Sequence, residues 1–393
     1  MGSALAHHWT LDPEVTFLNH GSFGACPRVV QQAQQRIRDE IERQPVRFFV
    51  RRLNDRLDAA RERLATFLGA DPAGLVAVAN ATTGVNAVLR SLPFGPDDEL
   101  LVTDHEYNAC RNAIEFVGGR SGAKVVVVSL PFSGATAGIV EQAILDAVTP
   151  RTRLVLVDHV TSQTAMILPV ENLVRRLDER GVDTLVDGAH APGMLPLDLT
   201  GLGSAYYTGN CHKWLCAPKG AGFLHVREDR REQIRPLTIS HGTNTRRPGR
   251  SRFHDEFDWV GTDDPSAFLC VPESIDFIGS LLPGGWPEVM TRNRSLVLAG
   301  RETIRRALEV DAPCPDSMIG TLASLPLPDG SPGPPESPLY TDPLQDVLLE
   351  TYGIEVPVIA WPAPPKRLLR LSAQLYNGED DYDRLAAAIG RTL

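Results

Sequence analysis

Tyr206-Tyr-Thr-Gly-Asn-Cys-His-Lys-Trp-Leu-Cys-Ala-Pro-Lys-Gly-Ala-Gly-Phe-Leu-His-Val226 is the stretch that decides the fold, and Lys213 lies at its centre. Short apolar runs at Ser204 to Thr208 and Gly222 to Val226 predict a strand on either side of the lysine. A partly desolvated lysine loses its proton readily and attacks carbonyl carbons, as Schiff-base lysines do. The alternative is an exposed turn, because most lysines are exposed. Two further stretches favour the reactive amine.

The first of these stretches is Thr184-Leu-Val-Asp-Gly-Ala-His-Ala-Pro-Gly193, in which an apolar run ends at Asp187. Open α/β sheets bind ligands at the carboxyl ends of their strands. A buried carboxylate at that edge needs a cationic partner, because an unpaired buried charge is costly. The protonated ring nitrogen of pyridoxal phosphate is such a partner.

The second stretch is Val78-Ala-Asn-Ala-Thr-Thr-Gly-Val-Asn86, which turns from a strand-like run into a helical pattern. Backbone N–H groups at a helix start attract anions, and the hydroxyls of Thr82 and Thr83 add further donors. This stretch therefore predicts a phosphate site.

Six motifs together indicate a family. They are Asn-His-Gly-Ser-Phe-Gly (19–24), Ala-Thr-Thr-Gly-Val-Asn (81–86), Asp-His-Glu-Tyr-Asn-Ala (104–109), Asp-Gly-Ala-His (187–190), Asn-Cys-His-Lys-Trp (210–214) and Arg-Leu-Ser-Ala-Gln-Leu-Tyr-Asn (370–377). On these motifs the chain resembles the class V aminotransferase family of fold-type I pyridoxal-phosphate enzymes, and within it the isopenicillin N epimerase-like branch. The motifs keep the family's order and span nearly the whole chain, so chance agreement is unlikely.

The resemblance implies pyridoxal 5'-phosphate as cofactor, held by Lys213 as a Schiff base. It also implies that Asp187 pairs with the ring nitrogen and that His190 bonds to the phenolic oxygen. An aromatic ring after the strand that ends near residue 103 stacks on the cofactor in the family, and we expect His105, with Tyr107 as second choice. A capped helix start is the alternative for that segment. The implied cofactor-binding set is Thr82, Thr83, His105, Tyr107, Asp187, His190, Asn210, His212, Lys213 and Thr262.

The resemblance further implies a substrate side and a partner subunit. Arg370 is expected to take the carboxylate of an amino acid with its planar fork. Asn19, His20 and Ser22 are expected to line the substrate pocket, although a plain turn is an equal alternative for each. Thr262 is expected to reach the phosphate of a neighbouring subunit, which makes the active unit a homodimer.

Strand and helix patterns alternate from residue 75 onward, and the strands are nearly continuous apolar runs such as Val125 to Val128. Such runs are typical of a largely parallel sheet covered on both faces. We therefore expect an α/β fold of the fold-type I kind, with a mostly parallel seven-stranded sheet and a smaller α+β part. The predicted divisions are an arm (1–20), a large cofactor-binding domain (21–265) and a small C-terminal domain (266–393). The predicted strands are 75–79, 99–103, 123–130, 154–158, 184–187, 204–208, 222–226 and 368–371.

Two segments are predicted to be loops. Residues 239–262 form a long loop whose arginines, including Arg246 and Arg252, either meet an anionic substrate group or face solvent. Leu325 to Pro338 is rich in proline and glycine and is expected to form neither strand nor helix.

Composition excludes several classes of partner. The net charge of −10 and the pI near 5.5 argue against nucleic acid and against an anionic membrane. No apolar run reaches the roughly 18 residues that a membrane span needs, and no secretion signal is evident. The six cysteines show no metal-ligand spacing, so we expect reduced thiols, no metal and a cytoplasmic protein.

Several reactions remain open from the residues. Lys213 would remove the Cα proton of an amino acid, a step that lyases, epimerases and transaminases share. Elimination of sulfur from an S-conjugated cysteine in specialised metabolism is the first expectation, epimerisation the second, and deamination or transamination the third. Desulfuration is disfavoured because Gly353 to Lys366 lacks the nucleophilic cysteine that the family's desulfurases carry there. A dinucleotide-binding protein is disfavoured because Ala79 to Gly84 is not a Gly-x-Gly-x-x-Gly turn.

Overall fold

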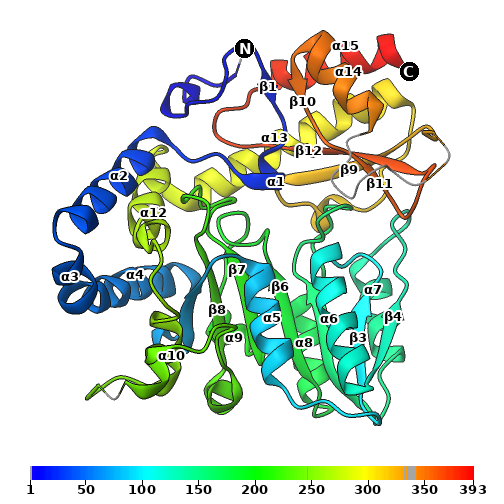
Figure 1. The fold of residues 1–393 in the computed structure, drawn as a ribbon. Coiled ribbons are helices and arrows are strands. Elements are labelled where there is room, and N and C mark those ends of the chain that lie inside the picture. The colour runs from blue at the N-terminus through cyan, green and yellow to red at the C-terminus, as the bar shows by residue number, and fades with distance from the viewer. Residues whose placement is uncertain (1, 246, 332, 334–341) are drawn as a thin grey trace.

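The computed structural model describes residues 2–245, 247–331, 333 and 342–393. Its centre is a sheet with helices on both faces, and the C-terminal elements lie across one end of that sheet (Figure 1). The helices are α1 (His20–Phe23), α2 (Arg28–Arg43), α3 (Pro45–Arg47), α4 (Leu53–Leu68), α5 (Ala81–Ser91), α6 (Asn108–Ser121), α7 (Ala137–Asp146), α8 (Val170–Asp178), α9 (Leu199–Leu202), α10 (Arg252–Asp258), α11 (Ser266–Leu269), α12 (Val271–Ser280), α13 (Gly285–Leu308), α14 (Pro343–Tyr352) and α15 (Glu379–Thr392). The α/β class is as predicted.

The central sheet has seven strands in the order β2-β8-β7-β6-β5-β3-β4. Six of the strands run parallel, and β8 alone runs against its two neighbours. The strands are β2 (Leu75–Val78), β3 (Glu99–Thr103), β4 (Lys124–Val128), β5 (Thr152–Asp158), β6 (Asp183–Gly188), β7 (Tyr206–Asn210) and β8 (Gly222–Val226). The prediction of a mostly parallel seven-stranded sheet is confirmed.

Both faces of the sheet are buried, which explains why its strands read as continuous apolar runs. On β5, Leu154 and Leu156 belong to a core shared with α5 and α6. Val155 and Val157 belong to a second core shared with α4, α7 and α8. Since successive side chains point to opposite faces, every position needs an apolar residue when helices cover both sides.

The run Val125 to Val128 departs from that expectation. It forms β4, the strand at the edge of the sheet, and Val127 is 43% exposed. An edge strand has a neighbour on one side only, so an apolar sequence alone did not predict its burial.

The C-terminal elements form a second, smaller sheet. Strands β11 (Val358–Ala360), β12 (Arg367–Ser372) and β9 (Leu322–Leu327) pair antiparallel in that order. Near the start of the chain, β1 (Thr16–Phe17) pairs in parallel with β10 (Ile354–Glu355). The first residues of the chain are therefore attached to its last quarter (Figure 1).

Two predicted segments differ from the structure. Residues 239–262 contain helix α10, which Ser251 caps through its side chain. The predicted loop from Leu325 begins inside β9, where Leu325 to Leu327 pair with β12. Residues 332 and 334–338 of that loop lie outside the described residues, as does Arg246.

None of the described helices is by itself long and apolar enough to cross a membrane. The segments 266–280 and 285–308 meet the length and composition test only as a pair, bent by 71°.

Candidate functional site

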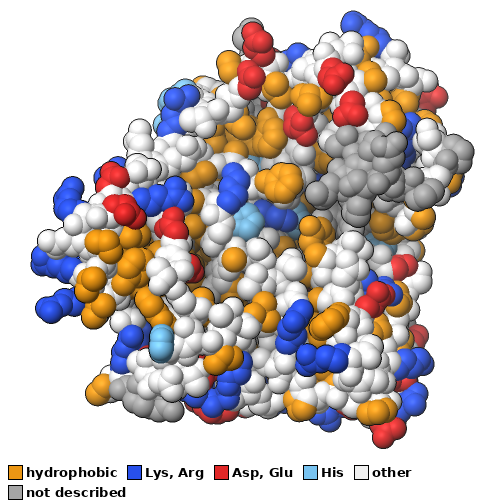
Figure 2. Space-filling model, viewed as in Figure 1, with side chains coloured by type: hydrophobic (Ala, Val, Ile, Leu, Met, Phe, Trp, Pro, Cys, Tyr) orange, Lys and Arg blue, Asp and Glu red, His pale blue; other side chains and the backbone are white. Residues whose placement is uncertain are grey.

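The candidate site lies where the carboxyl ends of β5, β6 and β7 face the C-terminal elements. Figure 2 shows histidine and basic side chains gathered in the middle of this face, between the sheet and the smaller part of the molecule. Strands β5, β6 and β7 pair in parallel, which brings their carboxyl ends, with Asp158, Asp187 and Asn210, to one edge. The segment that follows β7 carries Lys213 to the same edge.

Lys213 and His190 form the centre of the site. Lys213 Nζ lies 3.0 Å from His190 Nε2. Burial, reinforced by the charge of Arg370, lowers the pKa of Lys213 to about 7. An amine with this pKa is largely unprotonated at slightly alkaline pH, which a nucleophilic lysine requires.

The hydrogen bonds of His190 fix which of its nitrogens carries the proton. The indole N–H of Trp214 donates to His190 Nδ1 over 3.3 Å. Burial and the neighbouring Lys213 hold the pKa of His190 well below its usual value, so the ring is neutral. A neutral imidazole that accepts at Nδ1 carries its proton at Nε2. His190 therefore donates to Lys213 Nζ, and the lysine accepts as a free amine.

Asp187 is a buried carboxylate that has no cationic partner within the described residues. Its Oδ1 accepts from the Ala189 N–H over 2.9 Å, and its Oδ2 accepts from the Cys110 thiol over 3.1 Å. Burial raises the pKa of Asp187. A protonated ring nitrogen would supply the missing positive charge, so this position fits pyridoxal phosphate.

The start of α5 forms the candidate phosphate cradle. Asn80 caps the helix by accepting from the Thr83 N–H over 2.8 Å, and the Asn210 side chain accepts from the Ala81 N–H over 2.8 Å. The N–H and hydroxyl of Thr82 are donors of the kind a phosphate needs. His212 lies beside them and is held through Nδ1 by the Ala221 carbonyl over 3.0 Å.

A close approach brings this helix start to the sheet. A Cβ atom at Gly84 would overlap Oγ1 of Thr208 on β7. Glycine at this position therefore allows α5 to lie against β7, beside the segment that carries Lys213.

Arg370 on β12 is buried at the substrate side of the site. It donates to the Ser162 carbonyl over 2.8 Å and to the Ser22 hydroxyl over 2.8 Å. Burial lowers the pKa of Arg370 to about 10, which leaves the guanidinium charged at neutral pH. No acidic side chain pairs with it among the described residues, so its charge is available to a substrate carboxylate.

The N-terminal turn contributes two of its three predicted residues directly to Arg370's surroundings. Ser22 donates to Asn19 Oδ1 over 2.5 Å while it accepts from Arg370. His20 lies elsewhere, buried behind the lysine segment. Its ring nitrogens contact the Tyr376 hydroxyl at 2.8 Å and the Lys213 carbonyl at 3.0 Å.

His105 and Tyr107 occupy different environments. His105 is buried, with Nδ1 2.8 Å from the Thr164 hydroxyl and Nε2 3.1 Å from the Leu130 carbonyl. Its ring packs edge-on against Trp361 at 4.7 Å between centroids. Tyr107 is 44% exposed and lies close enough to Arg370 to raise the pKa of its guanidinium. Which ring stacks on a cofactor stays a prediction.

The long loop and Thr262 lie away from the lysine. Arg250 pairs with Asp58, Asp255 and Asp258, so its charge is neutralised within the chain. Thr262 is exposed on the segment that follows α10, where its donation to a partner subunit stays a prediction.

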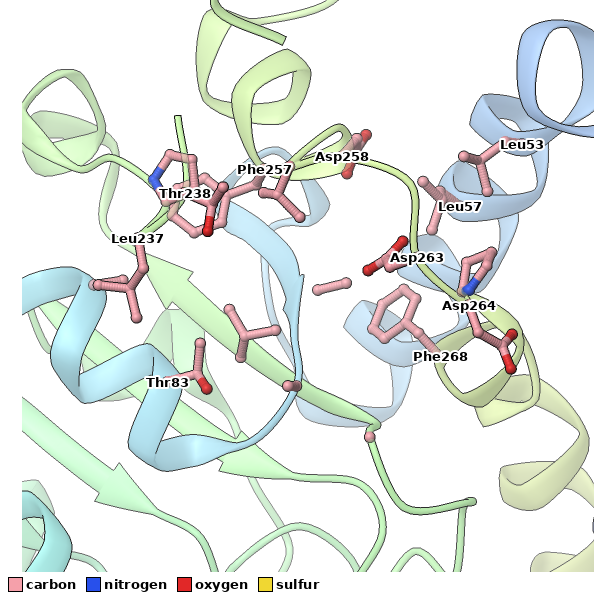
Figure 3. A pocket seen from close by; sticks show the side chains of 18 residues that line it. Leu53, Leu57, Thr83, Leu237, Thr238, Phe257, Asp258, Asp263, Asp264 and Phe268 are labelled. Atoms are coloured by element: carbon pink, nitrogen blue, oxygen red, sulfur yellow. The ribbon is translucent and has the colours of Figure 1, made fainter. Parts of the chain in front are cut away.

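A separate cavity of about 330 Å³ lies on the other side of α5's first turn (Figure 3). Its lining is mainly apolar, and Thr83, Leu237, Asp263 and Phe268 face it (Figure 3). Lys213, Asp187 and Arg370 do not line it. Apart from Thr83, which belongs to the predicted phosphate set, its lining residues are separate from those of the candidate site.

Sequence reasoning missed three groups that the structure places at the site. Trp214 orients His190, Cys110 donates to Asp187, and Glu106 lies buried against Asp158. Glu106 lies just before α6 and Cys110 lies in its first turn, and their ligand atoms are within 4.8 Å of each other. Their position directly after a strand end was the available signal.

The chain is similar to several known proteins. The family model described as aminotransferase class-V matches residues 15–280. The chain is 38% identical to isopenicillin N epimerase of Amycolatopsis lactamdurans over 97% of its length and 96% of that protein's. It is 32% identical to putative L-cysteine desulfhydrase 1 of Oryza sativa subsp. japonica, covering 98% of this chain and 84% of that one. A mutant of C-DES with glycine covalently linked to its PLP cofactor superposes with a TM-score of 0.80 at 22% identity, over 98% of both chains.

Proposed function

Because the chain belongs to the class V aminotransferase family and uses pyridoxal phosphate as its cofactor, we propose that it eliminates sulfur from an S-conjugated L-cysteine. The coarser assignment, a pyridoxal-phosphate-dependent lyase or epimerase, follows from the family and its relatives. L-Cysteine desulfhydrases and hercynylcysteine sulfoxide lyase are among those relatives, which supports C–S cleavage. The substrate would belong to specialised metabolism.

The observation that carries this proposal is the pairing at the centre of the site. Lys213 is a partly desolvated amine 3.0 Å from His190, and the chain offers Arg370 as an unpaired cation for the substrate carboxylate. Elimination needs one base and one leaving group. Epimerisation also needs an acid on the opposite face of Cα, and His20 is a poor candidate because the protein engages both of its ring nitrogens.

Each residue of the site has a separate role in the proposed reaction. The Arg370 fork binds the substrate carboxylate, and Ser22 and Ser162 hold the fork in place. When bound, pyridoxal phosphate supplies an electron sink for the pair released at Cα. Asp187 would balance the positive ring nitrogen, and Thr82 and His212 would hold the phosphate, whereas the N–H and the hydroxyl of Thr83 already donate to Asn80.

Lys213 performs the proton transfer. Its Nζ takes the Cα proton, a Cα–Cβ double bond forms, and the Cβ–S bond breaks with its electron pair leaving on sulfur. The thiolate then takes up a proton. Hydrolysis of the remaining three-carbon unit gives pyruvate and ammonia.

The test is product analysis with the purified, cofactor-loaded protein. S-substituted L-cysteines are expected to give equal amounts of thiol and pyruvate, and Lys213→Ala is expected to give neither. Lys219→Ala is the matched control, since Lys219 bonds to the Gly24 carbonyl, outside the residues assigned to the chemistry. Turnover without thiol release would contradict the proposal.

Epimerisation is the second candidate, and the identity of 35–38% to isopenicillin N epimerases over nearly the whole chain favours it. Tyr107 would then be the opposite-face acid, because it is exposed near Arg370. Tyr107→Phe would abolish inversion of a chiral amino acid while leaving elimination intact. Deamination or transamination would instead release or transfer the amino group with no thiol.

A further inference from the structure

Three acidic groups lie buried together beneath the site. Glu106, Asp158 and Asp187 are 5%, 3% and 2% exposed. The ligand atoms of Glu106, Cys110 and Asp187 all lie within 4.8 Å of one another. The mechanism above uses Asp187 alone, so the other two carboxyl groups need an explanation.

Glu106 and Asp158 are neighbours, because Asp158 pairs with Asp187 across β5 and β6 and Glu106 lies beside Asp187. Both carboxyl oxygens of Glu106 and Oδ2 of Asp158 have no hydrogen-bond partner within the described residues. Two ionised carboxylates at hydrogen-bond distance repel each other and leave buried acceptors unsatisfied. One proton between them removes both penalties, because a protonated carboxyl donates to an ionised one.

The hydrogen bonds of the cluster indicate where that proton resides. Asp187 accepts from the Ala189 N–H and the Cys110 thiol, and both bonds favour its ionised form. Burial and the charges of Asp158 and Asp187 raise the pKa of Glu106 well above its usual value. The pKa of Asp158 is raised by burial and by the charge of Asp187 but lowered by its hydrogen bond with Glu106, which places the proton on the Glu106 side of the pair. Lys213 lies on the open side of the cluster, and its charge, when the amine is protonated, lowers the pKa of Asp158 and Asp187.

We propose that Glu106 and Asp158 share one proton in a carboxyl–carboxylate hydrogen bond, and that this pair acts as two positioning residues which leave Asp187 ionised. The shared proton is a property of the protein alone. Its effect at the cofactor rests on the proposed pairing of Asp187 with the ring nitrogen, so the two parts are tested separately.

Infrared difference spectroscopy of the apoprotein at neutral pH tests the shared proton. Wild type is expected to show the carbonyl band of a buried protonated carboxylic acid, shifted in heavy water, that Glu106→Gln/Asp158→Asn lacks. Each substitution keeps the side-chain shape, and thermal unfolding checks that the variants fold. The proposal fails if wild type lacks the band, or if the double variant keeps it and Asp187→Asn removes it.

Cofactor affinity tests the consequence for Asp187. Glu106→Ala leaves Asp158 ionised with no donor beside Asp187, and we expect about tenfold weaker binding of pyridoxal phosphate, as removal of an outer partner does elsewhere. Glu106→Gln can donate its amide N–H to Asp158 and should restore affinity. Glu115→Ala, on the outer face of α6, is the matched control. If Glu106→Ala bound pyridoxal phosphate as tightly as wild type, the positioning role would be overturned. The infrared test of the shared proton would not be affected by that result.

Discussion

At the scale of single residues, the site depends on one lysine being uncharged. Its amine accepts from a neutral histidine, which an indole N–H holds in the required tautomer. Three side chains from two short segments thus prepare the nucleophile before any ligand binds.

The rate at which apoprotein bonds covalently to pyridoxal phosphate should follow the protonation of Lys213. Its pKa is lowered from 10.5 to about 7, so the amine is protonated below pH 7 and free above it. The rate should therefore rise as pH increases through about 7 and then level off. Stopped-flow absorbance measures it, and Lys213→Ala supplies the blank. A rise centred near pH 10 would contradict the lowered pKa.

Trp214→Phe should disturb this arrangement without removing the lysine. The substitution keeps an aromatic ring but deletes the N–H that fixes His190. We expect the cofactor to bind and the rate of Cα deprotonation to fall by about tenfold, the effect of losing about 1.4 kcal/mol of hydrogen bonding. Exchange of the substrate Cα hydrogen with heavy water measures this step. An unchanged exchange rate would remove Trp214 from the mechanism.

Arg370→Lys should weaken substrate binding selectively. Lysine keeps the charge but cannot reach Ser22, Ser162 and a carboxylate with one planar fork. We expect kcat/KM to fall by about 10- to 100-fold, which corresponds to about 1.5–3 kcal/mol for a charged hydrogen bond. Arg367→Lys is the control, because Arg367 lies on the same strand but pairs with Asp342. Equal effects in both variants would indicate damage to β12.

At the scale of elements, the contact between α5 and β7 sets the position of the phosphate cradle. Gly84→Ala places a methyl group against Thr208. We expect a loss of about 1–3 kcal/mol in the free energy of unfolding, as overpacking usually causes, together with weaker cofactor binding. Gly138→Ala in α7 meets no atom within 4 Å and should be neutral or slightly stabilising. Denaturant unfolding of both apoproteins compares them.

The functional residues at the strand ends could be predicted from the sequence, whereas the residues that pack against them could not. The apolar runs next to Asp187 and Lys213 are strands, and helices cover both faces of the sheet at these strands. Val127 was misjudged because a sequence does not say which strand is at an edge. The hydrogen bond that Arg370 donates to Ser22 joins residues 348 positions apart, so no local pattern predicts it. Glu106 was overlooked because only the folded structure brings its side chain next to Asp158.

At the scale of the whole molecule, the predicted homodimer can be tested by complementation. If Thr262 completes the partner's phosphate site, Lys213→Ala and Thr262→Ala subunits should restore one intact site in each mixed dimer. Random mixing should then give about a quarter of the wild-type activity per subunit, since half of the dimers are mixed and each has one intact site. Subunits are mixed after reversible dissociation, and dimer mass is checked by light scattering. Activity no greater than the average of the two separate variants would contradict donation by Thr262.

The pairing of β1 with β10 has a consequence for how recognition is assembled over time. Asp187, Lys213 and the start of α5 all lie within the first 220 residues, whereas Arg370 and the strand that anchors the opening arm come near the end. During synthesis, the part of the site expected to bind the substrate carboxylate can therefore form only after the last strands emerge from the ribosome. A fragment that ends before β9 would keep Asp187, Lys213 and the start of α5 but would lack Arg370.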